Sequence, residues 1–219
     1  MANPERTARA DSMLTQERIL EASVTLFSER GYNGTSMRAI ADAAGVNLAA
    51  ANYHFGSKAQ LLEAAFNQCI APINAGRIRR LEALQARPHA PGVEAIVRAF
   101  VDVGTALKID STLPRFLARL FAEPKSLSVP LLARAFASTM QPYVAALKHA
   151  LPEVDPEDLR WRFHFVIGAM IHLSHFDAPL NPLENDSPAA PDSSWGGTEA
   201  LVRFTVAGLC QGVDRGEAG

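Results

Sequence analysis

The sequence predicts an all-α protein of about nine helices, with a three-helix N-terminal part and a larger C-terminal helical bundle. Three observations predict this class. Apolar residues recur at helical spacing through nearly every patterned segment. No segment alternates apolar and polar residues as a half-buried strand does, and no hairpin turn is found. The chain has 219 residues, of which 48% are hydrophobic and 20% charged, which is an ordinary globular composition with enough length for a large helical core.

The first predicted helix begins at Thr15, a residue type that caps helix N-termini, and stops at Gly31, which fits a left-handed C-terminal turn. Its apolar face consists of Ile19, Ala22, Leu26 and Phe27. Residues 1–13 are mostly polar and mixed in charge, so we expect them to form a flexible N-terminal arm.

Two short helices are expected next, at residues 37–44 and 48–54, and each lies between a capping residue and a glycine. The caps and glycines are Thr35 or Ser36, Gly45, Asn47 and Gly56. Helices this short are marginal in isolation, so they must pack against the first helix through their apolar residues. These are Ile40, Ala41, Val46, Ala51 and Phe55.

The spacing in this segment is that of a helix-turn-helix. Ala41 is the small residue expected where two helices cross, Gly45 permits the turn, and Val46 points inward. This arrangement predicts that the helix starting after Asn47 enters a DNA major groove, with its N-terminal residues toward the base edges.

The remaining helices are longer, and most carry an apolar stripe. They are expected at residues 58–87, 93–107, 113–122, 129–150, 156–176 and 198–211. Pro72 is expected to kink or break the first of them, and Pro142 to bend the fourth. Asp155 followed by Pro156 is a strong helix start. The segment 177–197 is rich in Pro, Ser, Gly, Asn and Asp, which predicts a long loop.

Composition and motifs disfavour several classes of function. The sequence has no glycine-rich phosphate loop, no HExxH or GxSxG motif and no clustered carboxylate pair, so we expect neither an enzyme nor a bound cofactor. No apolar run approaches the roughly 20 residues that span a bilayer, and the first residues lack a signal-peptide core, so we expect a cytoplasmic protein with no membrane partner. Cys69 and Cys210 are expected to be buried free thiols.

Three histidines, His164, His172 and His175, lie on one predicted helix. The i, i+3 spacing of the last two suits a metal, but no Cys or carboxylate lies at matching spacing nearby. Polar lining of a pocket or an interface is therefore the favoured interpretation, and no metal site is assigned.

Charge does not by itself indicate nucleic-acid binding. The net charge is −2, and the first 60 residues hold six basic and six acidic side chains. A DNA-binding interpretation therefore depends on the motif.

The segment from Leu14 to Phe66 resembles the tetracycline-repressor (TetR) family of transcription regulators. The resemblance rests on Gly31-Tyr32, Thr35-Ser36, Ile40-Ala41, Ala44-Gly45-Val46, Tyr53-His54-Phe55 and Ser57-Lys58. It implies a ligand-responsive regulator, usually a repressor, that binds a double-stranded DNA operator as a homodimer. On this resemblance, residues 14–60 form the helix-turn-helix DNA-binding domain and residues 61–219 form the ligand-binding and dimerisation domain.

The resemblance also implies a set of DNA contacts. Phosphates would be met by the hydroxyl of Thr35 or Ser36 and by Tyr53, His54 and Lys58, with Arg38 a further candidate. Base edges would be met by Leu48, Ala49, Ala50 and Asn52, next to the cap Asn47. Of these, Asn52 can read adenine through two hydrogen bonds, and Leu48 or an alanine can touch a thymine methyl group.

Some of these assignments have plain alternatives. Tyr53 either contacts DNA or packs inside the protein, and Arg38 either contacts DNA or is a solvated helix residue. Arg6 and Arg9 belong either to a disordered tail or to an arm that reaches DNA. The family often has tyrosine at the position of Asn52, so the operator sequence stays open.

Two further sets of residues are assigned to the C-terminal half. The dimer surface is expected on the last two long helices, at Trp161, Phe165, Gly168, His172, Leu201, Phe204 and Gly208. A cavity for a mostly apolar effector is expected among Phe100, Val103, Leu107, Phe116, Phe121, Phe136, Met140, Phe163, Ile167 and Met170. The alternative for both sets is an ordinary intramolecular core.

The stretch NLAAANYHFGSK is similar to a subgroup that includes a bacterial fatty-acid-responsive regulator, which suggests a fatty acid or an acyl thioester by analogy. The competing functions are an enzyme and a helical small-molecule-binding or adaptor protein without DNA binding. Salt-dependent binding to DNA separates the regulator from both.

Overall fold

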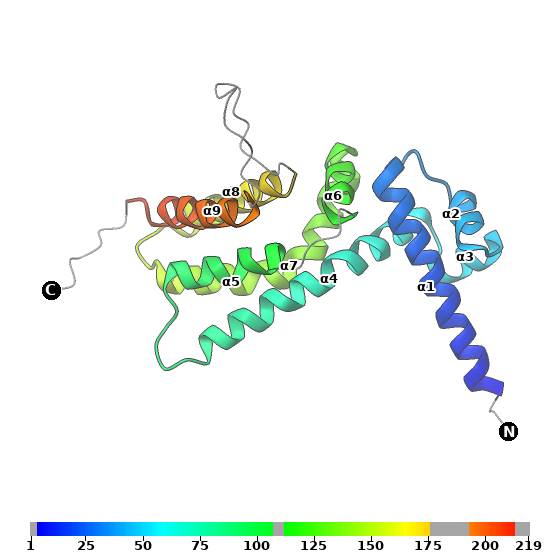
Figure 1. The fold of residues 1–219 in the computed structure, drawn as a ribbon, viewed down its shortest axis with the longest axis horizontal. Coiled ribbons are helices and arrows are strands. Elements are labelled where there is room, and N and C mark those ends of the chain that lie inside the picture. The colour runs from blue at the N-terminus through cyan, green and yellow to red at the C-terminus, as the bar shows by residue number, and fades with distance from the viewer. Residues whose placement is uncertain (1–3, 107–111, 176–192, 213–219) are drawn as a thin grey trace. The chain divides into compact units, whose positions relative to one another are not determined.

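The structure is a computed structural model that describes residues 4–106, 112–175 and 193–212, with side chains described for residues 11–102, 112–172 and 197–212. The described residues form nine α-helices and no strand (Figure 1), which confirms the all-α class. The helices are α1 (Pro4–Arg30), α2 (Met37–Ala44), α3 (Leu48–Phe55), α4 (Lys58–Gln85), α5 (Val93–Ala106), α6 (Thr112–Ala122), α7 (Lys125–Ala150), α8 (Pro156–His175) and α9 (Ser193–Cys210). Within these ranges, no helix is both long enough and apolar enough to cross a bilayer.

The chain folds into two compact units. The N-terminal unit comprises Met1–Pro72 and Asp110–Phe136, and the C-terminal unit comprises Ile73–Ile109 and Ala137–Gly219. Helices α4 and α7 each contribute one part to each unit. The predicted division at residue 60 falls near the start of α4, whereas the compact N-terminal unit continues to Pro72 and also includes α6.

Aromatic rings explain why α6 belongs to the N-terminal unit. Phe116 of α6 lies between Phe27 of α1 and Phe66 of α4, with ring centroids 6.3 and 5.6 Å away. All three side chains are fully buried. Helix α1 also packs against α2 and α3 (Figure 1), so one core supports both the helix-turn-helix and α6.

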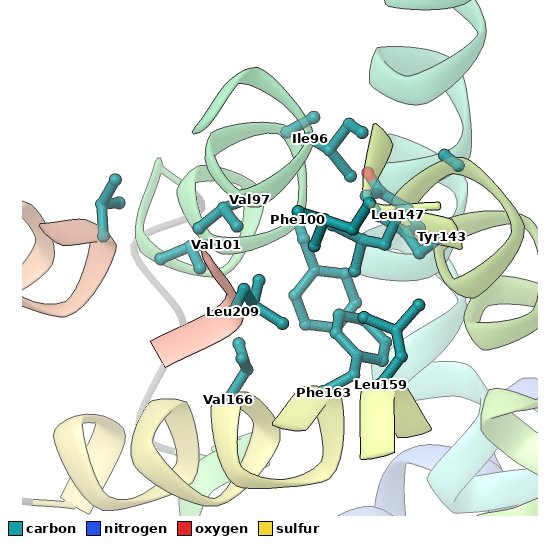
Figure 2. Packing of buried hydrophobic residues seen from close by; sticks show 14 of the residues in the cluster. Ile96, Val97, Phe100, Val101, Tyr143, Leu147, Leu159, Phe163, Val166 and Leu209 are labelled. Carbon is teal, nitrogen blue, oxygen red and sulfur yellow. The ribbon is translucent and has the colours of Figure 1, made fainter. Parts of the chain in front are cut away.

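The core of the C-terminal unit is centred on Phe100 of α5 (Figure 2). The Phe100 ring lies 5.0 Å from the ring of Tyr143 on α7 and 5.1 Å from that of Phe163 on α8. Helix α9 packs against both α5 and α8. Since Leu81 of α4 also belongs to it, the cluster ties five helices together.

The first helix begins earlier than predicted, since residues 4–13, which were assigned to the N-terminal arm, are helical. Thr15 does not cap this helix. Its hydroxyl donates instead to the carbonyl of Asp11 at 2.8 Å, one turn earlier in the same helix. A threonine inside a helix can satisfy its hydroxyl in this way, so its presence alone did not mark a helix start.

Three later boundaries also differ from expectation. Helix α4 continues through Pro72 without a break. Helix α7 starts at Lys125 instead of residue 129, because the Pro124 carbonyl accepts from the amides of Leu127 and Ser128 and forms an extra turn. Helix α9 starts at Ser193, inside the segment expected to be a loop, although Gly, which disfavours helix, occupies residues 196 and 197.

Candidate functional site

The first helix of the motif is capped by a side chain at its start. The hydroxyl of Ser36 accepts a hydrogen bond from the Ala39 amide at 3.1 Å, which satisfies a backbone donor that the helix leaves free. Between the two possible caps, the structure therefore selects Ser36. Ile40 and Ala41 of α2 are buried at 0% and 1% exposure, so this helix turns its apolar face to α1.

The turn between α2 and α3 is a glycine C-cap. Gly45 has φ 64°, the left-handed conformation that glycine adopts without strain. The Gly45 amide donates to the Asp42 carbonyl and the Val46 amide to the Ala41 carbonyl, which is the bonding pattern of a Schellman turn. Arg18 of α1 donates from Nη2 to the Gly45 carbonyl at 3.2 Å, so α1 also fixes the turn.

Helix α3 then presents an open surface. Asn47 caps it, with Oδ1 accepting from the Ala50 amide at 2.7 Å. Only Ala51 and Phe55 of this helix are buried, one turn apart on its inner face. The predicted base-facing and phosphate-facing residues lie on the remaining surface: Asn47, Ala49, Asn52 and Tyr53 are exposed, and Leu48, Ala50 and His54 are half-buried.

Tyr53 is 86% exposed, so the alternative that it packs inside the protein is wrong. Its ring lies edge-on to the ring of His54, with centroids 5.4 Å apart. Arg38 of α2 is also exposed and takes part in none of the ion pairs that the described residues form. Both side chains are free to meet a phosphate group.

Two of the predicted phosphate contacts have partners within the protein. Thr35 is 3% exposed, and its hydroxyl lies 2.8 Å from the Gly31 carbonyl and 3.2 Å from the Leu26 carbonyl. Lys58 points inward: its Nζ donates to the carbonyls of Tyr32 and Thr35, both at 3.0 Å, and lies 4.0 Å from the centroid of the Tyr32 ring. Both side chains therefore hold the backbone that leads into α2, and Thr35 is too buried to be an exposed contact for DNA.

A carboxylate distant in sequence binds the segment between α1 and α2. Glu123, just after α6, accepts from the Tyr32 amide at 2.8 Å and from the Asn33 side-chain amide at 3.1 Å.

Arg134 of α7 forms two hydrogen bonds with Glu63 of α4 in the same unit, and this contact lowers the pKa of Glu63. Neither this pair nor the contacts of Glu123 were predicted from the sequence, because a contact between residues so far apart leaves no local pattern.

Two family models match the chain. The model of bacterial regulatory proteins of the tetR family matches residues 19–65, the part that contains α2 and α3. The model of the tetracyclin repressor-like C-terminal domain matches residues 94–208, which is more than half of the chain. The chain belongs to the tetR family of bacterial regulatory proteins. The family resemblance found in the sequence is thereby confirmed.

Two curated relatives are similar to part of this tetR-family chain. The probable HTH-type transcriptional regulator YttP of Bacillus subtilis is 45% identical over 49 residues, 22% of this chain and 24% of that protein. The biofilm operon icaADBC HTH-type negative transcriptional regulator IcaR of Staphylococcus aureus is 36% identical over 59 residues, 27% of this chain and 32% of that protein. The aligned part spans about a quarter to a third of these relatives.

A solved structure extends the likeness to nearly the whole tetR-family chain. NalD, the secondary repressor of the MexAB-OprM multidrug efflux pump in Pseudomonas aeruginosa, has a TM-score of 0.64 and 21% identity, covering 90% of this chain and 97% of that one. At this level of identity, the likeness establishes a shared fold.

The residues predicted for dimerisation of this tetR-family protein lie mostly on an open face of α8 and α9. Trp161, Phe165 and Phe204 are 56%, 64% and 69% exposed. Gly168, His172 and Gly208 are also exposed, and a side chain added at either glycine would meet no atom within 4 Å. Leu201 is the exception: it is 7% exposed and belongs to the core cluster of the C-terminal unit, so its assignment to the outer face is wrong.

The residues predicted to line an effector cavity are divided between the two units. Phe100, Met140, Phe163, Ile167 and Met170 belong to or pack against the core cluster of the C-terminal unit. Phe116, Phe121 and Phe136 belong to the N-terminal unit, where Phe116 is buried in the core and Phe121 is 50% exposed. Leu107 and the side chain of Val103 lie outside the described residues.

Both cysteines are free and half-buried, and burial raises the pKa of the Cys69 thiol. His164 is exposed and its ring lies edge-on to Trp161, at a centroid distance of 5.8 Å. The side chain of His175 lies outside the described residues. In the described part, no group of three or more His, Cys, Asp or Glu side chains is placed to hold a metal ion.

One buried residue was missed altogether. Arg77 of α4 is 2% exposed, although it was not among the residues predicted to be buried. The available signal was its spacing, because Arg77 lies four residues after Ile73 and four before Leu81, both of which are buried.

Proposed function

We propose that this tetR-family protein is a homodimeric DNA-binding repressor whose affinity for its operator falls when a mostly apolar small molecule binds to the C-terminal unit. The observation that carries DNA binding is the surface of α3. Its cap and its two buried residues fix the helix, and its remaining side chains are open to a partner. A short helix held in this way is suited to enter a major groove.

The proposed DNA contacts are of two chemical kinds, one for phosphates and one for base edges. Ser36, Arg38 and Tyr53 supply hydroxyl and guanidinium groups for phosphates, which set the position of the protein on the duplex. Asn52 and the alanine at position 49 supply an amide and a methyl group for base edges. Thr35 and Lys58 act indirectly, by holding the backbone from which Ser36 and α2 begin.

Dimerisation is supported by the exposed aromatic residues of α8 and α9. Large exposed apolar residues that gather on one face often mark an interface. This face is also preformed: Arg162 of α8 is ion-paired with Asp158 and donates to the carbonyls of Leu209 and Gln211 at 2.9 and 2.8 Å. The positive charge at the C-terminus of α9 stabilises that helix end and joins it to α8.

The effector is proposed to be mostly apolar, with a fatty acid or an acyl thioester as the first candidates. Five of the residues predicted to meet it gather in the apolar cluster of the C-terminal unit. Repression is proposed as the mode of action because IcaR, which is similar over part of its length, is described as a negative regulator. Effector binding would favour a conformer whose reading helices no longer match the operator half-sites.

DNA binding is tested with duplexes selected from a random pool by the purified protein. The logarithm of the affinity should fall linearly with the logarithm of the salt concentration, because phosphate contacts release counterions. The variant Asn52→Ala should lose roughly ten- to a hundredfold in affinity for the selected sequence. Asn67→Ala, at an exposed position of α4, is the matched control and should bind as the native protein does. Binding without salt dependence, or equal loss in both variants, would reject the proposal.

The response to effector is tested on the same duplex with dodecanoate as the probe. We expect weaker operator binding when dodecanoate is present. Equal affinities with and without it would reject dodecanoate, and with it the fatty-acid candidate, as the releasing signal.

A further inference from the structure

The C-terminal unit encloses a positive charge that has no negative partner. Among the described residues, Arg77 is the one charged side chain that is buried, at 2% exposure. Its Nε donates to the Phe100 carbonyl at 3.0 Å, and its Nη2 lies 3.2 Å from Sδ of Met170. Its Nη1 is buried and has no hydrogen-bond partner.

The surroundings of this guanidinium are apolar. Its central carbon lies 4.0 Å from the centroid of the Phe100 ring, the residue at the centre of the cluster in Figure 2. The Tyr143 hydroxyl donates at 2.8 Å to the backbone carbonyl of Arg77, so it does not pair with the guanidinium. None of the ion pairs that the described residues form includes Arg77, and Asp102 of the same unit pairs with Arg80 at 3.5 Å.

A charge in this position is costly to the fold. Burial lowers the pKa of Arg77 to about 10, so the side chain still carries its charge at neutral pH. A buried charge without a partner is among the more destabilising features of a protein interior, and charged groups kept in such places are candidates for functional sites.

A second donor without a partner lies in the same unit. Thr139 of α7 is fully buried, and its hydroxyl makes no hydrogen bond. It precedes Tyr143 by one helical turn, so the two residues share the face of α7 that contacts α4 at Arg77. Arg77 and Thr139 therefore leave a guanidinium nitrogen and a hydroxyl of the same unit without hydrogen-bond partners.

We propose that Arg77 binds the carboxylate of an amphipathic acid whose apolar tail packs in the hydrophobic cluster of the C-terminal unit. The proposal rests on the effector site of the proposed function and names the chemistry of its occupant. The carboxylate accepts from Nη1 of Arg77, and the tail lies among side chains such as Phe163, Ile167 and Met170, which belong to or pack against the cluster. The thioether of Met170 is flexible and weakly bonded, so it can yield to the incoming oxygen.

The number of charges favours a free acid over an acyl thioester. Arg77 offers one positive charge and one uncommitted nitrogen, which match a single carboxylate. A thioester carbonyl has no charge to offer, and a carrier bearing several phosphates needs several cations. The buried residues of the described part include no cation other than Arg77.

The test measures direct binding to the delipidated, full-length protein by calorimetry without DNA, so that its outcome is independent of operator release. Dodecanoate and dodecan-1-ol have the same tail and differ in the head group. We expect the native protein to bind the acid at least about tenfold more tightly than the alcohol, because a charge-assisted hydrogen bond is lost in the alcohol. Equal binding of the two, or binding of neither, would overturn the proposal.

Variants at Arg77 assign the preference to this side chain. Arg77→Met keeps an apolar stem of similar shape and should bind acid and alcohol alike, whereas Arg77→Lys keeps a positive charge and should retain part of the preference for the acid. Arg79→Met removes an exposed arginine of the same helix and is the matched control. An Arg77→Met protein that is folded by circular dichroism and still prefers the acid would refute the assignment. If that variant fails to fold, a reduced preference in folded Arg77→Lys, with Arg79→Met unaffected, supports the role of the guanidinium, and full retention contradicts it.

The two proposals can fail separately. Acid binding that depends on Arg77, without any change in operator affinity, would reject the regulatory role of the ligand and keep the anion site. Operator release by dodecan-1-ol as effective as release by dodecanoate would keep the regulation and reject the anion site.

Discussion

Removing the exposed aromatic side chains of α8 and α9 should convert the proposed dimer into monomers. Phe165 and Phe204 are 64% and 69% exposed in the single chain. With a full area of about 200 Å² for a phenylalanine side chain, each of them offers roughly 130 Å² for burial. At about 25 cal/mol per Å², each buried ring contributes about 3 kcal/mol.

A two-fold dimer would bury both residues on both copies, so the gross contribution is about 13 kcal/mol. Association costs a large part of this through lost rigid-body freedom and side-chain ordering. Even if only about 4 kcal/mol is realised, the double variant F165S/F204S should raise the dimer dissociation constant about a thousandfold.

Sedimentation velocity over a wide range of protein concentration measures this change directly. Phe121→Ser is the control, because Phe121 is 50% exposed but belongs to the N-terminal unit, whereas α8 and α9 belong to the C-terminal unit. We expect this control to sediment as the native dimer. The reasoning is refuted if F165S/F204S, with native circular dichroism, dimerises as well as the control, or if the native protein is a monomer throughout.

Two further outcomes follow from local contacts. Asn47→Ala removes the side-chain cap of α3 and should lower the unfolding free energy by about 1 kcal/mol, measured by urea denaturation. The same variant should also bind the operator less tightly. Unchanged stability would show that this cap is dispensable. The guanidinium of Arg98, bonded to Glu199 at 2.7 and 2.9 Å, lowers the pKa of that carboxyl below 4.5. This pair therefore stabilises the fold above the unfolded-state pKa and loses its effect as the pH falls through the lower folded-state value. With Arg98→Gln, stability should therefore fall less steeply as the pH decreases below about 4.5, as measured in acid titrations followed by fluorescence. The same pH dependence in the variant and the native protein would contradict this.

Elements fixed by neighbouring residues were predicted well from the sequence. The cap of α3 by Asn47, the turn at Gly45 and the start of α8 after Asp155 all depend on hydrogen bonds between residues at most a few positions apart. Ser57 and Gln60 illustrate the same point, since each side chain accepts from the backbone amide of the other at the start of α4. Such contacts leave a pattern of residue types at fixed spacing, which a sequence displays directly.

Side-chain direction was predicted less well where partners are distant. Lys58 begins α4 as expected, but the carbonyls that draw its ammonium inward are 23 and 26 residues away. Leu201 follows the apolar stripe of α9, yet it faces the core of its own unit, not outward. Helical periodicity gives the apolar face of a helix, but it does not tell whether that face meets the same chain or a second copy.

Arg77 shows the same limit for a charged residue, whose side chain faces inward where its residue type suggests an exposed position. A charged residue between two buried apolar positions is usually placed at the edge of the apolar stripe, with its head group in water. Here the carbonyl of Phe100 and the ring of the same residue accommodate the guanidinium inside the unit. Its spacing to Ile73 and Leu81 places this arginine on the buried face, unlike Arg79 and Arg80, but this spacing does not tell whether the guanidinium stays inside or reaches water.

Helix α4 connects the two proposed activities along the chain. Lys58, its first residue, holds the carbonyls of Tyr32 and Thr35 just before α2, and Arg77, farther along the same helix, is the proposed anchor for the effector. A ligand that pulls on Arg77 acts on an element that also fixes the backbone in front of the helix-turn-helix. In the proposed mechanism, a displacement of α4 at its first residue would act on the turn that carries Ser36 through the hydrogen bonds of Lys58.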